Sequence, residues 1–206
     1  MKPALYFNLD LTLTEMSVPF SEITAQVFEE IGVPHGKRDG AAFAELFFEE
    51  LDGGGQTPWQ RAFTRYFDER DVTLDARRAA KRYVDLELDA VQPAFADLQS
   101  FVQRLTERVP VGVLTRGIGH VQLAKLDKLG LSDILDDVVI SHEVGASKAD
   151  GSLFRAAEER REAAAFVYVS THSSDIRHAA SAGWRTIFAE PEQLRETIIE
   201  WLSKHV

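Results

Sequence analysis

The feature that most constrains the fold is a series of short runs in which almost every residue is apolar. The runs expected to form strands are 4–7, 111–114, 138–140, 166–169 and 186–189. Strands of this kind are buried on both faces, as in parallel sheets covered by helices. Helical patterns between the runs predict helices at 94–108, 119–129, 152–161 and 175–182, and a C-terminal helix. This alternation predicts an α/β fold with a parallel sheet.

Residues 15–92 interrupt the alternation after the first strand and show helical spacing throughout. Four amphipathic helices are expected, the last from Asp75 to Asp89; Thr57-Pro58 is typical of a helix start, and Gly53-Gly54-Gly55 of a turn before it. The apolar stripes of the first three helices are Phe20, Ile23, Val27 and Ile31; Phe43, Leu46, Phe47 and Leu51; and Trp59, Ala62, Phe63, Tyr66 and Phe67. We predict two domains, an α/β core of residues 1–14 and 93–206 and a helical bundle of residues 15–92.

Polar clusters lie just past the ends of four of the predicted strands. The carboxyl ends of parallel strands meet at one edge of a sheet, where open α/β folds bind their ligands, so these clusters are expected to converge. They are Asn8, Asp10 and Thr12; Thr115, Arg116 and Gly117; Ser147 and Lys148; and residues 170–175. Their order along the chain predicts one crevice that contains the catalytic or ligand-binding side chains.

The order and spacing of these clusters resemble the haloacid dehalogenase-like (HAD) superfamily over nearly the whole chain. Asn8-Leu9-Asp10-Leu11-Thr12 resembles the family's first motif, Asp-x-Asp-Gly-Thr. The other three motifs resemble residues 114–117 (LTRG), 145–154 (GASKADGSLF) and 169–183 (VSTHSSDIRHAASAG). The resemblance implies a HAD-like Rossmannoid core in which residues 15–92 form a helical cap domain, as in the phosphoglycolate phosphatase and haloacid dehalogenase-like branches.

The resemblance also implies a role for each matching residue. Asn8 stands at the position of the nucleophilic Asp, and Asp10 at that of the acid that protonates the leaving group and later activates water. The positions implied to bind the phosphate group are those of Thr12, Thr115, Arg116 and Lys148. The positions implied to bind Mg²⁺ are those of Asn8, Asp10 (through its backbone carbonyl) and Asp175.

Departures from the family pattern bear directly on activity. Asn8 carries a neutral carboxamide, which has no anionic oxygen to attack phosphorus, so an aspartyl-phosphate is not expected. Thr171 replaces an acidic metal ligand, Ser170 replaces a Gly, and Leu11 replaces another Gly that lets backbone and ligand approach closely. Because Mg²⁺ is usually held by carboxylates, we expect weak or absent magnesium binding.

Two functional interpretations stay open at the level of sequence. In the first, the protein is a catalytically impaired HAD-like hydrolase, a pseudoenzyme that binds a ligand or partner or acts in regulation. In the alternative, it is an active Mg²⁺-dependent phosphatase that hydrolyses a phosphoric monoester, with Asp10 as the general base on water. Dehalogenation would require the same missing nucleophile.

Several of these residues also have ordinary structural explanations. Asn8 and Asp10 could simply cap a turn, and Lys148 could be a solvated loop lysine. Asp175 could serve the N-terminus of a helix, and His172 could be a solvated loop histidine. The aromatic side chains of residues 15–92 are expected mainly in a core.

The composition limits the partners. The chain has 33 acidic and 23 basic residues, a net charge of −10, which disfavours nucleic-acid binding because Lys and Arg neutralise phosphates. The absence of cysteine excludes disulfides and thiolate sites. Without an apolar run long enough for a membrane span or a signal-peptide pattern, a cytoplasmic protein is expected. A small phosphorylated ligand or a protein partner is compatible with this composition, and the chain is expected as a monomer or homodimer.

Overall fold

The computed structural model describes residues 1–36, 38–50 and 57–206, without the side chain of Phe48. The chain forms two compact units. The α/β unit contains Met1–Glu15 and Gln92–Val206, and the helical unit contains Met16–Val91.

The α/β unit is built on a five-stranded parallel sheet with the strand order β5-β4-β1-β6-β7. The strands are β1 (Ala4–Phe7), β4 (Val111–Thr115), β5 (Asp137–Ile140), β6 (Phe166–Ser170) and β7 (Arg185–Phe188). In the central strand β1, Leu5 lies opposite Val111 on one side and Val167 on the other. Every residue of β1 is buried, as an apolar strand in the middle of a sheet requires. The predicted α/β fold with a parallel sheet is confirmed.

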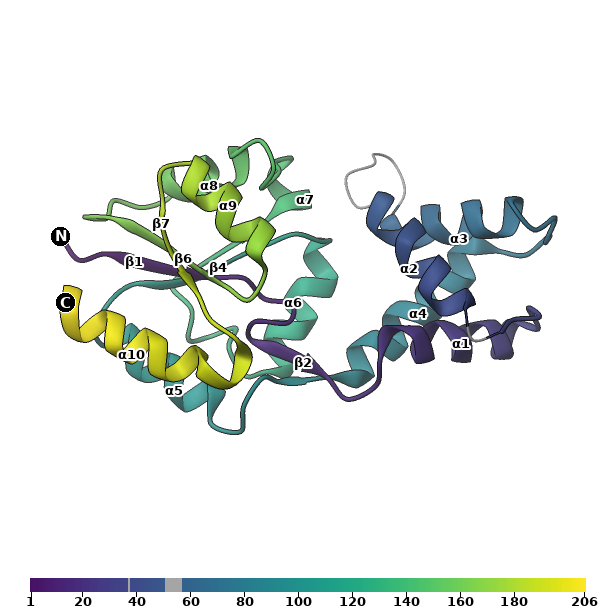
Figure 1. The fold of residues 1–206 in the computed structure, drawn as a ribbon, viewed down its shortest axis with the longest axis horizontal. Helices are drawn as coiled ribbons and strands as arrows, with labels where there is room; N and C mark the ends of the chain where they lie inside the picture. The colour runs from purple at the N-terminus through teal and green to yellow at the C-terminus, as the bar shows by residue number, and fades with distance from the viewer. Residues whose placement is uncertain (37, 51–56) are drawn as a thin grey trace. The chain divides into compact units, whose positions relative to one another are not determined.

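Helices cover both faces of this sheet (Figure 1). Helices α5 (Leu98–Thr106) and α10 (Leu194–His205) lie on one face, and α8 (Ser152–Glu158) and α9 (Ser173–Ser181) on the other. The core that involves α8 and α9 includes Tyr6, Leu114, Phe154, Tyr168 and Trp184. Three further helical elements are α6 (Gly119–Lys128) after β4, the short α7 (Ser141–Val144) after β5, and a 3-10 turn (Pro191–Gln193) before α10.

Some element boundaries differ from the predictions. Helix α5 begins at Leu98 and not near residue 94, because the N–H of Ala94 donates to the carbonyl of Leu13 (3.0 Å) and ties this stretch to the first loop. Helix α8 ends at Glu158, three residues before the predicted end. The sequence patterns also missed α7 and the two-stranded sheet of β2 (Thr14–Met16) and β3 (Val91–Pro93), since such short elements are below the length at which periodicity is visible.

The helical unit contains α1 (Phe20–Ile31), α2 (Asp39–Glu49), α3 (Pro58–Asp68) and α4 (Ala76–Ala90). Helix α3 starts as predicted: the Thr57 hydroxyl accepts a hydrogen bond from the Gln60 N–H (3.2 Å), and Pro58 follows it. The Asp75 side chain caps α4 in the same way. Two further expectations, Leu51 in the second apolar stripe and a turn at Gly53-Gly54-Gly55, lie outside the described residues.

Aromatic side chains form the interior of the helical unit. Phe28 stacks on Tyr66 with 4.6 Å between ring centroids, and Phe43 lies 4.3 Å from Phe63. The Tyr66 hydroxyl donates to Asp39 Oδ1 (2.8 Å), which satisfies the polar end of a ring that is otherwise buried. These aromatic residues therefore belong to a core, as expected.

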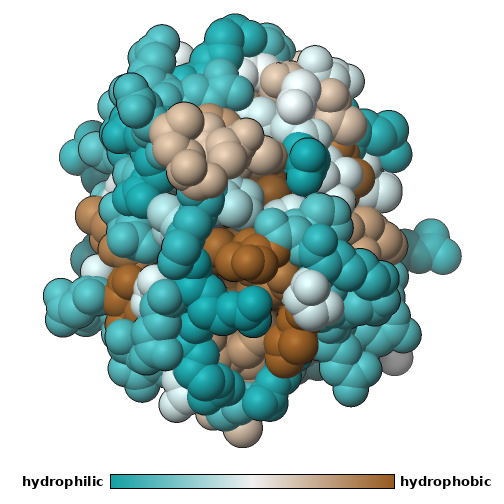
Figure 2. Space-filling model, turned by 90° about the vertical axis from the view of Figure 1, so that its left-hand side faces the viewer, coloured by the Kyte–Doolittle hydropathy of each residue, from teal (hydrophilic) through white to brown (hydrophobic). Residues whose placement is uncertain are grey.

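The surface of the α/β unit is mostly hydrophilic at the end where both chain termini lie (Figures 1 and 2). Apolar side chains on this face form small, separate areas (Figure 2). None of the described helices combines the length and the apolar character needed to cross a membrane.

Candidate functional site

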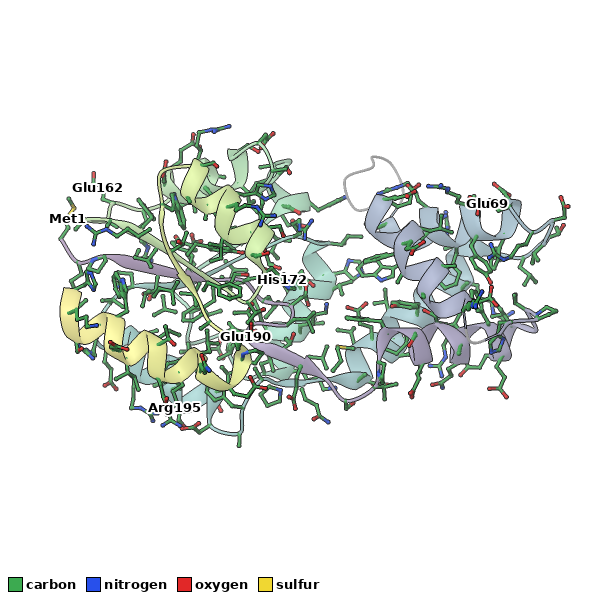
Figure 3. The ribbon with its side chains drawn as sticks, in the orientation of Figure 1. Met1, Glu69, Glu162, His172, Glu190 and Arg195 are labelled. Atoms are coloured by element: carbon green, nitrogen blue, oxygen red, sulfur yellow. The ribbon has the colours of Figure 1, made fainter. Side chains whose placement is uncertain are left out.

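The candidate site begins in the turn that follows β1. The carbonyl of Leu9 accepts hydrogen bonds from the N–H groups of Thr12 (3.2 Å) and Leu13 (2.9 Å), which folds residues 8–13 into a tight loop. Within it Leu11 has a φ of 58°, a left-handed conformation that costs a residue with a Cβ about 1–2 kcal/mol. Figure 3 shows His172, in the loop after β6, toward the carboxyl ends of the strands, with Met1 toward the opposite end of the sheet.

Lys148 makes the central contacts of the site. Its Nζ atom donates to Asn8 Oδ1 (2.9 Å) and to Asp175 Oδ2 (2.5 Å), and lies 5.2 Å from the centre of the Tyr168 ring. The side chains of Lys148 and Asp175 are 2% and 3% exposed, so the ion pair is buried. The explanation of Lys148 as a solvated loop lysine is wrong. Asp175 lies in the first turn of α9 and also takes part in the site, so its two explanations are compatible.

Burial and charge shift the pKa values of this group in opposite senses. Burial lowers the pKa of Lys148 to about 8, against the opposing effect of the Asp175 carboxylate. Burial raises the pKa of Asp175, but the Lys148 ammonium outweighs it and brings the pKa below its usual 3.8. Burial also raises the pKa of Tyr168, whose hydroxyl donates to Asp175 Oδ2 (3.3 Å). Near neutral pH the site therefore contains an ammonium, a carboxylate and a neutral phenol.

Asp10 is held by two residues of α6 that the sequence interpretation missed. Lys125 Nζ donates to Asp10 Oδ1 (2.7 Å), and Gln122 Nε2 donates to Oδ2 (2.8 Å). Burial raises the pKa of Asp10, but the Lys125 ammonium and these hydrogen bonds together lower it below its usual value. Gln122 and Lys125 are buried on the same stripe of α6 as Val121 and Leu126. Polar residues at core positions of a predicted helix were the pattern that could have revealed them.

Three threonines complete the contacts between the loops. The Thr115 hydroxyl accepts a hydrogen bond from Gln122 Nε2 (2.9 Å) and is buried. The hydroxyl of Thr12, also buried, accepts from the N–H of Thr171 (3.3 Å), and the Thr171 hydroxyl donates to the carbonyl of Leu11 (2.8 Å). Thr171 thus lies beside the first loop, with a hydroxyl where the family resemblance implies a carboxylate. His172 is half-buried next to it and its N–H donates to the Ser170 hydroxyl (3.0 Å).

Arg116 joins the site from the end of β4. Its Nη2 atom lies 4.0 Å from Asp175 Oδ1, and its side chain is 40% exposed. The structure therefore brings together the residues to which the family resemblance assigns a catalytic, phosphate-binding or metal-binding role, and adds Gln122, Lys125 and Thr171. We call this set the strand-end cluster: Asn8, Asp10, Thr12, Thr115, Arg116, Gln122, Lys125, Lys148, Thr171 and Asp175.

The oxygens implied to bind Mg²⁺ do not fit a metal ion in this arrangement. Asn8 Oδ1 accepts from Lys148, the carbonyl of Asp10 accepts from Asn8 Nδ2 (2.8 Å), and Asp175 Oδ2 accepts from Lys148. Each of these three oxygens already has a hydrogen-bond donor from the protein, and the other oxygen of Asp175, Oδ1, lies 4.0 Å from the Arg116 guanidinium. Within the described part of the chain, no three His, Asp or Glu side chains are grouped so that they could hold a metal ion. A hard divalent cation prefers carboxylate and water oxygens, and this donor set is largely neutral or already paired.

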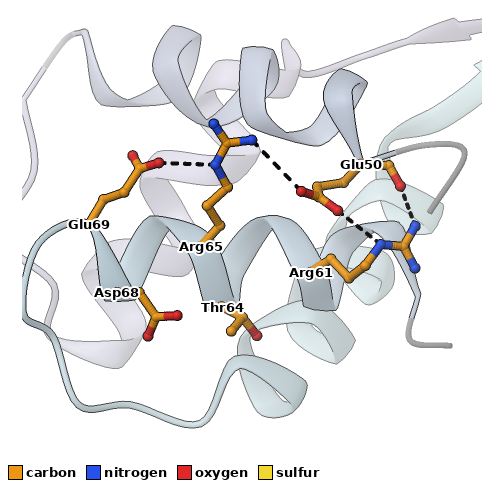
Figure 4. Close-up of a pocket in the computed structure, with 6 residues that line it drawn as sticks. All are labelled: Glu50, Arg61, Thr64, Arg65, Asp68 and Glu69. Carbon is orange, nitrogen blue, oxygen red and sulfur yellow. Dashed lines mark hydrogen bonds and ion pairs between the residues drawn. The ribbon is translucent and has the colours of Figure 1, made fainter. Parts of the chain in front are cut away.

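A separate hollow of about 310 Å³ lies in the helical unit (Figure 4). Its lining residues are Glu50, Arg61, Thr64, Arg65, Asp68 and Glu69. Arg61 pairs with Glu50 (3.0 Å) and Arg65 with Glu69 (3.0 Å), so the arginines already have carboxylate partners. This hollow has the character of a salt-bridged surface and not of a catalytic centre.

The parallel sheet with polar loops at its carboxyl ends defines a Rossmann-like α/β protein with its site at the strand ends. A family model described as haloacid dehalogenase-like hydrolase matches residues 5–189. The chain therefore belongs to the HAD-like hydrolase family.

Two curated relatives match part of the chain. One is the ribulose-1,5-bisphosphate 5-phosphatase of Halopiger xanaduensis, 30% identical over 101 residues, which cover 47% of this chain and 42% of that protein. The other is the pyrimidine 5′-nucleotidase YjjG of Escherichia coli, 30% identical over 91 residues, which cover 42% of this chain and 40% of that protein. The matched region thus spans less than half the length of each relative.

The fold is also similar to a solved structure, the HAD-hydrolase YfnB from Bacillus subtilis bound to magnesium. The TM-score is 0.79, with 98% of each chain covered and 18% sequence identity. At this identity the likeness shows a shared fold.

Proposed function

We propose that this HAD-like protein has kept the ligand crevice of its family, has lost covalent phosphoryl transfer, and acts by binding a ligand or partner or as a regulator. In this proposal the helical unit serves as the cap domain, the protein is cytoplasmic, and a small phosphorylated molecule or a protein is its partner. The phosphatase and nucleotidase relatives support a phosphate-bearing ligand.

The proposal depends on the neutral amide of Asn8 and on its hydrogen bonds. A carboxamide oxygen is a poor nucleophile, and no neighbouring group can make it anionic near neutral pH. In addition, Asn8 Oδ1 accepts from Lys148 (2.9 Å) while Asn8 Nδ2 donates to the Asp10 carbonyl (2.8 Å). Both ends of the amide are engaged within the protein, so Asn8 has a structural role at the position where the family attacks phosphorus.

The alternative is a Mg²⁺-dependent phosphatase in which Asp10 activates water. The side chain of Asp10 is 38% exposed, which favours this alternative because a general base must reach solvent. However, the ion pair with Lys125 stabilises the carboxylate and lowers its pKa, which makes Asp10 a weaker base. The contacts of Asp10 therefore favour binding over turnover.

A hydrolysis assay separates the two interpretations. We expect the purified protein to hydrolyse p-nitrophenyl phosphate in excess Mg²⁺ no faster than the buffer blank. The variant Asp10→Ala and the control variant Asp133→Ala, which changes an exposed residue, should likewise show no hydrolysis above the blank. Turnover that Asp10→Ala abolishes and Asp133→Ala preserves would overturn the proposal in favour of the phosphatase.

A gain-of-function variant tests the assignment of the motifs. The double variant Asn8→Asp/Thr171→Asp restores both anionic side chains implied by the family pattern, and we expect it to bind Mg²⁺ in a calorimetric titration. The wild-type protein should show no binding heat under the same conditions. If the double variant is folded and also binds no Mg²⁺, residues 8 and 171 do not occupy the positions that we assign to them.

A further inference from the structure

The charged side chains of the strand-end cluster do not balance. Lys125 pairs with Asp10 at 2.7 Å, and Lys148 pairs with Asp175 at 2.5 Å. Arg116 is a third cation, 4.0 Å from Asp175 Oδ1, which Lys148 already neutralises. The cluster thus contains three cationic and two anionic side chains, and the cation in excess is a guanidinium.

Exposure distinguishes Arg116 from the two lysines. The side chains of Lys125 and Lys148 are 4% and 2% exposed and lie at hydrogen-bond distance from their carboxylates. The Arg116 side chain is 40% exposed, and among the described residues its guanidinium has only one loose carboxylate contact. A ligand that arrives from solvent can therefore pair with Arg116 without separating a buried ion pair.

The chemistry of a guanidinium suits an oxyanion. Its planar set of N–H donors can give two parallel hydrogen bonds to one phosphate, and it stays protonated at every relevant pH. Lys125 and Lys148 are each engaged by a carboxylate, so a phosphate dianion at this edge of the sheet needs a further positive charge. Magnesium would meet that requirement elsewhere in the family, but the oxygens implied to hold it are already paired here.

We propose that Arg116 supplies the positive charge that a metal ion would otherwise bring, so that the strand-end cluster binds a phosphate dianion without any divalent metal. The inference rests on the proposed function in that it requires a ligand-binding crevice at the strand ends. It goes further because it assigns the charge of the absent metal ion to Arg116 and makes phosphate binding independent of metal.

The test is a calorimetric titration of inorganic phosphate into the protein, once in excess EDTA and once in excess Mg²⁺. We expect the same dissociation constant within about twofold in the two buffers, and a weakening of at least about tenfold in Arg116→Asn. Arg116→Lys keeps the charge without the planar donor set and should weaken binding less. The matched control is Arg104→Asn, because Arg104 is also half-exposed (52%) and lies 3.6 Å from a carboxylate, that of Asp97.

Three results would overturn the inference: binding only in Mg²⁺, an Arg116→Asn affinity equal to wild type, or no phosphate binding in either buffer. Thermal melting of each variant shows that it is folded, and Arg116→Lys provides the comparison if Arg116→Asn is not. The two proposals can fail separately, because the proposed function is tested by the absence of hydrolysis and the present inference by the binding of phosphate. A protein that hydrolyses p-nitrophenyl phosphate refutes the proposed function even if phosphate binds without metal.

Discussion

Removal of the Lys148 ammonium should destabilise the protein strongly, because it leaves Asp175 charged, buried and without its cation. The Nζ atom lies 2.5 Å from Asp175 Oδ2 and 2.9 Å from Asn8 Oδ1. Breaking a buried ion pair by removing one partner costs about 3–5 kcal/mol. Asn8 also loses the donor to its buried oxygen, which costs about 1 kcal/mol more. We therefore expect Lys148→Met to lower the free energy of unfolding by about 4–6 kcal/mol.

Urea denaturation measures this loss, followed by tryptophan fluorescence, to which Trp184 in the core of the α/β unit contributes. The double variant Lys148→Met/Asp175→Leu removes both charges and should recover most of the lost stability, since an apolar pair of similar volume is often neutral or stabilising. The matched control is Lys204→Met: Lys204 also lies 2.5 Å from a carboxylate, that of Glu200, but this pair is exposed to solvent, so its loss should hardly change the free energy of unfolding. If Lys148→Met lies within about 1 kcal/mol of wild type, the buried ion pair does not exist as described.

Two further outcomes are expected. Leu11→Gly should raise the free energy of unfolding by about 0.5–1 kcal/mol in the same assay, because relief of the strain at the positive φ of Leu11 outweighs the larger conformational entropy that glycine gives the unfolded chain. A decrease of more than about 1 kcal/mol would show instead that the packing of the half-exposed Leu11 side chain stabilises the fold. The pKa of Asp10 is lowered in the folded state, so its contribution to stability is complete above its usual 3.8 and is lost as pH falls through the folded value. Urea denaturation at a series of pH values should therefore show that the free energy of unfolding falls less steeply on acidification in Asp10→Asn than in wild type. Equal pH dependences of the two proteins would contradict the lowered pKa of Asp10.

The architecture of the α/β unit was predictable because it depends on chain order. Apolar runs such as 4–7 and 166–169 can be buried on both faces only in a covered parallel sheet, and the polar residues that follow them must then meet at one edge. Asn8, Arg116, Lys148 and Asp175 converge for this reason, although they lie far apart in the sequence.

The hydrogen bonds that Lys125 and Gln122 donate to Asp10 could not be predicted from chain order. Lys125 and Gln122 belong to a helix whose rotation about its axis decides whether a polar side chain faces the site or solvent. The contact between Lys125 and Asp10 joins residues 115 positions apart, and no local preference specifies it. The conformation of Leu11 could not be predicted either. Its positive φ is stabilised by the hydrogen bonds of the surrounding loop, because leucine itself does not favour this conformation.

The two departures from the family pattern at Asn8 and Thr171 are linked through the charge of the cluster. With Asp10 and Asp175 as the carboxylates, the three cations leave one positive charge in excess. A carboxylate at position 8 alone would cancel this excess and compete for Lys148, so Asn8→Asp should bind neither Mg²⁺ nor phosphate well. A second carboxylate at position 171 makes the cluster anionic, and only then does a divalent cation become the favoured partner. In the function that we propose, Asn8 and Thr171 are thus two parts of one electrostatic change, in which the Arg116 guanidinium replaces the charge of a metal ion.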